Sequence, residues 1–179
     1  MIGVLVSGSG TNLQALIDAG LPISAVASNR KDAYALVRAR EAGIPTATFS
    51  LGCHPDRRER DLVMAGWLEE HGVDLVVLAG YMHLLTEPFL QRFPGRIVNV
   101  HPSLLPAFPG AHAIADAIAA GVERTGVTIH YVDAGLDTGP VIAQEEVPVS
   151  PRETLEERIH AVEHRLLPEV VRGLCLAAR

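Results

Sequence analysis

Cysteine is scarce in this chain of 179 residues: only Cys53 and Cys175 are present, far apart in the sequence. They form neither a Cys-x-x-Cys pair nor the dense spacing of a disulfide scaffold. The sequence therefore predicts buried or idle thiols in a reducing compartment, with no disulfide framework. A chain of this length buries enough surface to fold as one compact domain without such cross-links.

Long apolar runs and a surplus of basic residues are lacking as well. No apolar stretch approaches the roughly 20 residues of a membrane-spanning helix, and the chain enters a strand-like segment at Ile2 with no signal-peptide pattern before it. The net charge is -6 and Lys31 is the only lysine, so no concentrated basic surface for nucleic acid is expected. We expect a cytoplasmic protein that binds small molecules, with neither a nucleic-acid nor a membrane partner.

What the sequence does contain is an alternation of short apolar segments with helix-like stretches. The strand-like segments are Ile2–Ser7, Ile23–Ser28, Thr46–Phe49, Leu75–Ala79, Ile97–His101, Val127–Val132 and Val141–Val147. The helix-like segments are Leu13–Ala19, Ala33–Ala42, Arg58–His71, Phe89–Arg92, Ala113–Ala120 and Pro151–Leu174. Strands that read as continuous apolar runs are buried on both sides, so we expect an α/β fold with a mostly parallel, twisted sheet and helices on both faces.

The pattern predicts a single domain over residues 1–179, in which residues 1–100 form a phosphate-binding half. Residues 101–179 supply a Pro-rich and Gly-rich loop, two further strands and a final helix. Gly43 is expected to end the second helix, and Ser150 to cap the last one with Pro151 in its first position. Pro168 is expected to break or kink that helix.

A glycine-rich loop, Ser7-Gly8-Ser9-Gly10-Thr11-Asn12, joins the first strand to the first helix. Glycines let the backbone approach a phosphate, and the amides at a helix start face it. The loop lacks the Gly-Lys-Ser/Thr ending of a Walker A motif and the third glycine of a dinucleotide fingerprint. It is therefore compatible both with an anion site and with a tight turn capped by Thr11 or Asn12.

Polar side chains gather at the carboxyl end of the strand Ile97–His101. Alternation places Asn99 and His101 on one face, where open α/β sheets bind their ligands. The loop Asp133–Pro140 could bring Asp137 to the same place, and a carboxylate favours the charged form of a neighbouring imidazole. An amide, a histidine and a carboxylate suit the addition of an amine to a carbonyl carbon. Each residue alone could equally serve a turn.

The order and spacing of these motifs resemble the phosphoribosylglycinamide formyltransferase family over almost the whole chain. The similarity rests on Ser7–Asn12, on Asn99-Val100-His101-Pro102-Ser103-Leu104-Leu105-Pro106, on Pro109-Gly110 and on Asp133–Pro140. It implies a Rossmann-like fold and a transferase that moves the formyl group of 10-formyltetrahydrofolate to the amine of glycinamide ribonucleotide in purine biosynthesis. It implies no metal, and a monomer or homodimer.

The resemblance also implies roles for individual residues. The catalytic group would be Asn99, His101 and Asp137. The ribonucleotide would be held by Gly10, Thr11, Asn12 and Glu163. The folate would be held by Arg58, Met82, His83, Leu84, Leu85 and Asn99. Three positions depart from relatives that carry an arginine or a lysine there: His83, Ala107 and His160.

Rival functions are less compatible with the sequence. A hydrolase of 10-formyltetrahydrofolate would share the catalytic group but resembles a chain with an added amino-terminal domain, and methionyl-tRNA formyltransferase resembles one with an added carboxyl-terminal domain. A noncatalytic phosphosugar-binding module would leave Asn99, His101 and Asp137 unexplained. The eight histidines form no His-Glu-x-x-His pattern, so a metal enzyme is disfavoured.

Overall fold

The computed structural model describes residues 1–177, and the chain forms two compact units, Met1–Val98 and Asn99–Arg179. The first unit contains, in order, β1 (Ile2–Val6), α1 (Thr11–Asp18), β2 (Ile23–Ser28), α2 (Tyr34–Glu41), β3 (Thr46–Thr48), a 3₁₀ turn η1 (Leu51–Cys53), α3 (Arg57–Glu70), β4 (Leu75–Leu78) and α4 (Glu87–Arg92). Strand β5 (Ile97–His101) runs from the first unit into the second. The second unit continues with α5 (Ala113–Ala120), β6 (Arg124–Tyr131), β7 (Val141–Pro148), a 3₁₀ turn η2 (Arg152–Thr154) and α6 (Leu155–Ala177).

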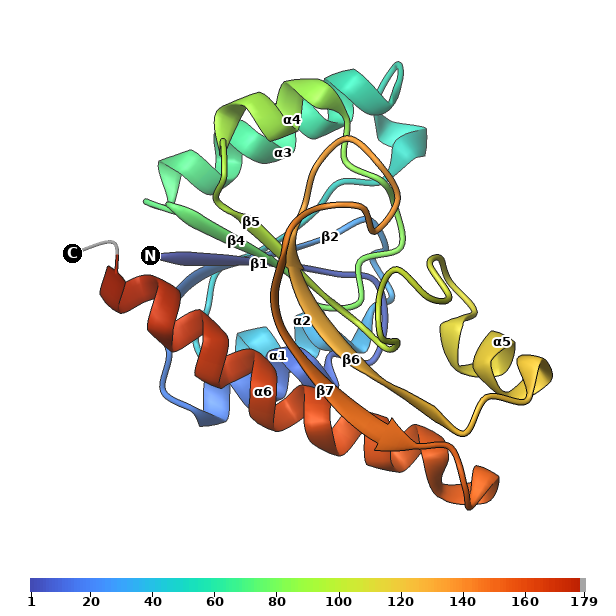
Figure 1. The fold of residues 1–179 in the computed structure, drawn as a ribbon. Coiled ribbons are helices and arrows are strands. Elements are labelled where there is room, and N and C mark those ends of the chain that lie inside the picture. The colour runs from blue at the N-terminus through green and yellow to red at the C-terminus, as the bar shows by residue number, and fades with distance from the viewer. Residues whose placement is uncertain (178–179) are drawn as a thin grey trace. The chain divides into compact units, whose positions relative to one another are not determined.

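The first unit is a parallel sheet between two layers of helices. Its strands follow the order β3-β2-β1-β4, and each neighbouring pair is parallel. Helices α1 and α2 lie on one side of these strands, and α3 and α4 lie on the other (Figure 1). All five residues of β1 and all four of β4 are buried, as expected for strands covered on both faces. The predicted α/β class with helices on both faces of a mostly parallel sheet is confirmed.

Local signals explain several element ends in this unit. Gly43 adopts a left-handed φ of 71° directly after α2, which confirms the predicted stop. Helix α3 begins after Asp56, whose side chain accepts a hydrogen bond of 2.9 Å from Glu59 N. At α1, Gly10 occupies the cap position without a side-chain bond, so neither Thr11 nor Asn12 is the cap that the alternative of a tight turn named.

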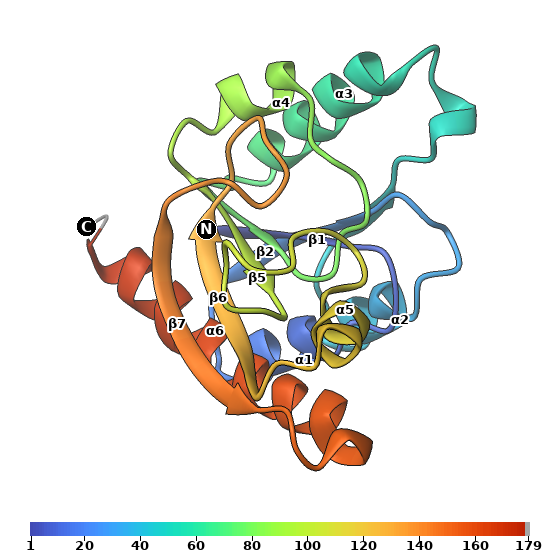
Figure 2. The ribbon, with the colours of Figure 1, turned by 45° about the vertical axis from the view of Figure 1, so that its right-hand side comes forward.

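The second unit is built on an antiparallel hairpin. Strands β6 and β7 pair from Arg124 opposite Pro148 to His130 opposite Val141. Helix α6 packs against both strands and runs along them (Figure 2). Its buried residues recur at helical spacing: Leu155, Ile159, Glu163, Leu166, Leu167, Pro168 and Val171.

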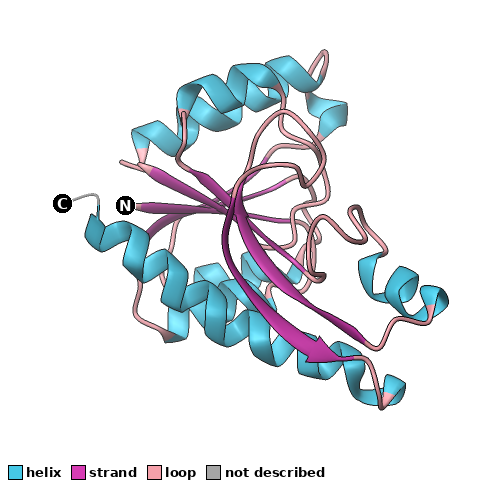
Figure 3. Cartoon of the chain, viewed as in Figure 1, coloured by secondary structure: helices cyan, strands magenta, loops and turns pink. Residues whose placement is uncertain are grey.

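Two expectations about local structure are wrong. Ser150 does not cap the last helix, because Pro151 is extended with ψ of 138° and a short 3₁₀ turn precedes α6 (Figure 3). Pro168 does not break α6, which continues from Leu155 to Ala177 with Pro168 buried inside it. Cys53 and Cys175 are both free thiols as expected, and Cys53 is exposed in η1, a turn that the sequence did not predict.

None of the helices within residues 1–177 combines the length and the apolar character that crossing a membrane requires.

Candidate active site

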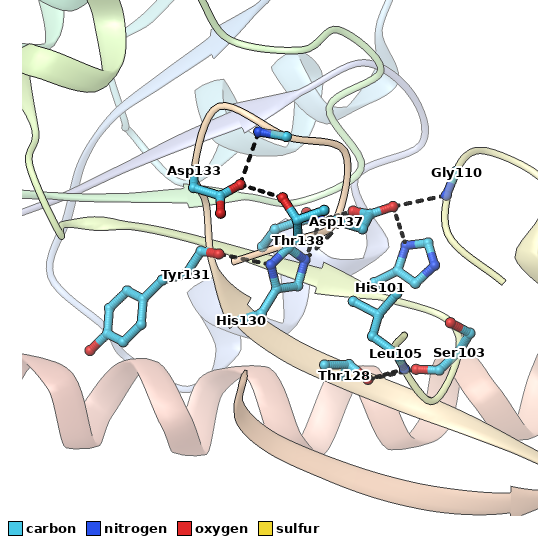
Figure 4. Close-up of polar contacts among 12 residues, drawn as sticks. His101, Ser103, Leu105, Gly110, Thr128, His130, Tyr131, Asp133, Asp137 and Thr138 are labelled. Carbon is cyan, nitrogen blue, oxygen red and sulfur yellow. Dashed lines mark hydrogen bonds and ion pairs between the residues drawn. The ribbon is translucent and has the colours of Figure 1, made fainter. Parts of the chain in front are cut away.

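The end of β5 and the loop between β6 and β7 bring three predicted residues together within the second unit. The His101 Nδ1 atom lies 3.4 Å from Asp137 Oδ2. The Asn99 amide nitrogen lies 3.5 Å from Asp137 Oδ1. Figure 4 shows the His101 ring and the Asp137 carboxylate pointing toward each other. Asn99, His101 and Asp137 therefore form one cluster, as the alternation along β5 and the sharp turn of the loop led us to expect.

The loop after β6 is shaped by its own residues so that it presents Asp137. Asp133 Oδ1 accepts hydrogen bonds from Gly135 N at 2.9 Å and from Thr138 Oγ at 2.6 Å (Figure 4). A Cβ atom added at Gly139 would lie 1.7 Å from Tyr131 O, so only glycine fits there. Asp137 itself adopts a left-handed φ of 52°, which aspartate tolerates better than most residues.

Asp137 is held as a carboxylate. Burial alone raises its pKa, but the contact with His130 in its protonated form, the hydrogen bond from Gly110 N, and the charges of His101 and His130 outweigh that effect and lower the pKa below its usual range. The Gly110 amide donates to Asp137 Oδ2 at 2.8 Å. The cluster thus contains a fixed negative charge beside an imidazole.

His130 is a member of the cluster that sequence reasoning missed. Its Nε2 atom lies 3.3 Å from the Asn99 amide nitrogen and 3.6 Å from Asp137 Oδ1, and only 2% of its side chain is exposed. A signal existed, because Thr128 and His130 alternate with Val127 and Ile129 in the predicted strand. This alternation indicates a polar face on the strand, but it does not indicate which residues of other segments contact that face.

The cluster has the parts for addition of a nucleophile to a carbonyl group. An amide N–H and an imidazole can stabilise an oxyanion, and the imidazole with its carboxylate can move a proton. His101 and His130 are buried, so their charges and dipoles act with little screening by water.

The glycine loop lies in the first unit, and the packing around Gly10 requires a glycine there. Gly10 adopts a φ of 75°, and a Cβ atom added there would lie 2.5 Å from Ala35 Cβ. Gly8 differs, since an added Cβ would meet nothing within 4 Å. Thr11 and Asn12 form the first residues of α1, whose opening amides point beyond the helix start. This geometry is compatible with anion binding at Gly10, Thr11 and Asn12.

The segment Met82–Leu85 also lies in the first unit, and a hydrogen bond from the start of α3 reaches it. Met82 and Leu84 are exposed, whereas Leu85 is buried. The Arg57 Nη2 atom donates to Leu84 O at 2.9 Å. The contact to this segment thus comes from Arg57, next to the predicted Arg58. The sequence pattern alone did not separate the two neighbouring arginines.

His83 is tied to a buried ion pair beneath the same segment. Arg60 and Asp61 have fully buried side chains, and Arg60 Nε donates to Asp61 Oδ1 at 2.7 Å. The Arg60 Nη1 atom lies 2.9 Å from His83 Nδ1, and the arginine can only donate, so His83 accepts with Nδ1. Burial first, and then the charges of Arg60 and Arg57, lower the pKa of His83. His83 therefore anchors the segment in its neutral form.

Further hydrogen bonds fix the two ends of the Met82–Leu85 segment. Met82 N donates to Ser7 Oγ at 2.9 Å at one end. At the other, Thr86 donates to Asp61 Oδ2 through its backbone at 2.8 Å and through its hydroxyl at 2.7 Å. The segment is thereby attached to β1 and to α3.

Glu163 lies on the packed face of α6, with 5% of its surface exposed. The His160 and His164 rings stack on the same helix with centroids 6.1 Å apart. Burial, and then the charge of His160, lower the pKa of His164. Within residues 1–177, no group of three or more His, Cys, Asp or Glu side chains could hold a metal ion.

The chain is similar to known proteins over almost its whole length. Residues 1–171 match the family model described as formyl transferase. The phosphoribosylglycinamide formyltransferase of Mycobacterium tuberculosis is 47% identical over 178 residues, which cover 96% of this chain and 83% of the relative. The solved structure of phosphoribosylglycinamide formyltransferase from Bacillus halodurans is 42% identical with a TM-score of 0.95, covering 99% of this chain and 96% of that one. Glycinamide ribonucleotide transformylase 1 from Symbiobacterium toebii is 49% identical with a TM-score of 0.93, covering 96% and 85%.

Proposed function

The chain belongs to the formyl transferase family, and on this premise we propose that it transfers the formyl group of 10-formyltetrahydrofolate to the amine of glycinamide ribonucleotide. The product is formylglycinamide ribonucleotide, an intermediate of purine biosynthesis. The observation that carries the proposal is the meeting of Asn99, His101 and Asp137 through contacts of 3.4 and 3.5 Å, in a chain whose relatives include phosphoribosylglycinamide formyltransferases.

The reaction needs a stabilised oxyanion and one proton transfer. The acceptor amine attacks the formyl carbon, a C–N bond forms, and the carbonyl electron pair moves to oxygen. Asn99 stabilises that charge as a hydrogen-bond donor, and His101 does so through its positive charge when it is protonated; one positioned donor is worth about 10²-fold to 10³-fold in rate. When the bond to N10 of the folate breaks, the proton released by the amine ends on N10, with His101 and Asp137 assisting its movement.

Binding roles extend the proposal to the other predicted residues. The ribonucleotide phosphate is held by the amides of Gly10, Thr11 and Asn12, with Glu163 contacting the acceptor. The folate is held by Asn99, by the Met82–Leu85 segment and by Arg58. Arg57 joins this group because it donates a hydrogen bond to Leu84 O. The reaction takes place in the cytoplasm, in a monomer or homodimer, with small-molecule partners and no metal.

The deciding experiment is an assay of the purified protein with both substrates, with and without a chelator. We expect equal amounts of formylglycinamide ribonucleotide and tetrahydrofolate, unaffected by the chelator. Formate and tetrahydrofolate without a formylated ribonucleotide would show a hydrolase instead. Binding of the ribonucleotide with no turnover would show a noncatalytic module. Loss of activity with the chelator, restored by zinc, would refute the metal-free mechanism.

A further inference from the structure

His101 has a hydrogen-bond acceptor at each ring nitrogen. Its Nε2 atom lies 2.8 Å from the Phe108 carbonyl oxygen, and its Nδ1 atom lies 3.4 Å from Asp137 Oδ2. A carbonyl oxygen can only accept, so Nε2 must carry a hydrogen. Nδ1 is then the nitrogen that gains and loses a proton, and it is the one that faces the Asp137 carboxylate.

The Phe108 carbonyl owes its direction to an uncommon backbone conformation. Phe108 has a φ of 52°, in the left-handed region that a bulky residue rarely occupies. Such a conformation persists only where surrounding contacts hold it, and it is often found at functional sites. The contacts that hold Phe108 in this conformation therefore also hold its carbonyl oxygen toward His101 Nε2. They come from the segment that leads from His101 to Phe108.

The Ser103 hydroxyl supplies those contacts from inside the turn. Ser103 is fully buried, and its Oγ donates to Ala107 O at 2.6 Å and lies 3.3 Å from Phe108 O. The Ala107 amide donates to Leu104 O at 3.0 Å and closes the same turn. One buried hydroxyl thus reaches both carbonyls at the far end of the turn.

A second hydroxyl fixes the beginning of the turn without reaching its end. Thr128 Oγ donates to Ser103 O at 2.7 Å and accepts from Leu105 N at 3.1 Å (Figure 4). The two hydroxyls are both buried and both anchor the turn, but only that of Ser103 contacts the Phe108 carbonyl. Thr128 therefore offers a matched control.

We propose that Ser103 is a positioning residue for His101: its hydroxyl aims the Phe108 carbonyl at Nε2 and thereby keeps Nδ1 as the nitrogen that moves the proton. The inference rests on the role of His101 proposed above. Without the hydroxyl, the neutral ring can place its hydrogen on Nδ1 and donate it to the Asp137 carboxylate. That hydrogen bond would tie up the nitrogen on which the transfer depends.

The first test compares Ser103→Ala with Thr128→Val by NMR of the histidine ring nitrogens at a pH where His101 is neutral, with the His101 signals assigned from a His101→Gln spectrum. We expect the wild type and Thr128→Val to carry the hydrogen on Nε2, and Ser103→Ala to carry a substantial fraction on Nδ1. The Ser103→Ala variant should lose roughly 10²-fold in kcat with little change in KM, as for other small misplacements of a catalytic group.

A second pair of variants tests the same point if Ser103→Ala folds poorly. Glycine adopts a left-handed φ without strain and a β-branched residue does not. Phe108→Gly should therefore keep the hydrogen on Nε2, whereas Phe108→Val should shift it to Nδ1 and lower kcat.

The outcomes separate this inference from the proposed function. A wild-type ring pattern or a wild-type kcat in Ser103→Ala would overturn it, and so would a shift in Thr128→Val equal to that in Ser103→Ala. If the wild type makes no formylated ribonucleotide, the proposed function fails, while the ring pattern still reports whether Ser103 sets the hydrogen on His101.

Discussion

The Nε2 atom of His130 lies 3.3 Å from the Asn99 amide nitrogen, and in the neutral ring this hydrogen bond has one direction. His130 Nδ1 lies 2.8 Å from Tyr131 O, which can only accept, so Nδ1 carries the hydrogen of the neutral ring. Nε2 is then an acceptor for Asn99. His130 orients the amide that we propose faces the oxyanion.

Replacement of His130 should therefore act through Asn99. We expect His130→Phe to lower kcat roughly 10-fold to 10²-fold, because a misoriented donor loses much of its value in the transition state. His130→Gln, which keeps an acceptor, should retain more activity. Steady-state kinetics of both variants beside Asn99→Ala would check this, and a wild-type kcat in His130→Phe would show that Asn99 needs no such partner.

The glycine loop offers a test that separates ligand binding from folding. Gly8→Ala should fold normally, since its added Cβ meets nothing within 4 Å, but should weaken ribonucleotide binding about 10-fold by obstructing the phosphate. Gly10→Ala should instead lose stability, because its Cβ would lie 2.5 Å from that of Ala35. Calorimetry and thermal unfolding would measure both.

Gly66→Ala in α3 is the control, because its added Cβ also meets open space outside the loop. It should leave ribonucleotide binding as in the wild type. Unchanged binding in Gly8→Ala as well would remove the loop from the phosphate site.

The two neighbouring arginines at the start of α3 can be told apart by substitution. Arg57→Ala removes the hydrogen bond to Leu84 O and should raise the KM for the folate about 10-fold. Arg58→Ala should have the smaller effect, although the resemblance assigned the role to Arg58. A larger effect of Arg58→Ala would restore that assignment.

His83 should make the protein sensitive to acid. Because its pKa is lower in the folded state than in the unfolded chain, the unfolded state binds more protons as the pH falls, and folding loses free energy. The loss should begin below about pH 6.5, the usual value for histidine, and continue toward the lower value of the folded state.

His83→Gln should therefore show a smaller drop in the free energy of unfolding than the wild type between about pH 7.5 and about pH 5.5. Urea titrations at the two pH values would measure it, with the exposed His112→Gln as a control that keeps the wild-type drop. An equal drop in His83→Gln would place the acid sensitivity elsewhere.

The sequence predicted those features that a single segment decides. Alternation along β5 placed Asn99 and His101 on one face, and Gly43 marked the end of α2. The Asp133–Pro140 loop contains its own turn-forming contacts, from Asp133 to Gly135 and Thr138, so its sharp turn was also expected.

Contacts between distant segments could not be predicted in the same way. Arg60 stands in the charged run Arg57–Asp61, which is typical of a solvated helix face, yet its side chain is fully buried, with Nε donating to Asp61 and Nη1 to His83. His130 meets Asn99 from another strand, and no local pattern states which strands become neighbours. Such residues emerge only when the packing is known.

The claim that Asn99, His101 and Asp137 form the transfer centre is tested most directly by single-turnover kinetics of Asp137→Asn, which keeps the shape of the side chain and removes its charge. We expect formyl transfer to slow by about 10²-fold to 10⁴-fold, while the dissociation constants of the ribonucleotide and the folate stay within about twofold of the wild type. A wild-type rate of formyl transfer in Asp137→Asn would reduce Asp137 to a turn residue and contradict the proposed mechanism.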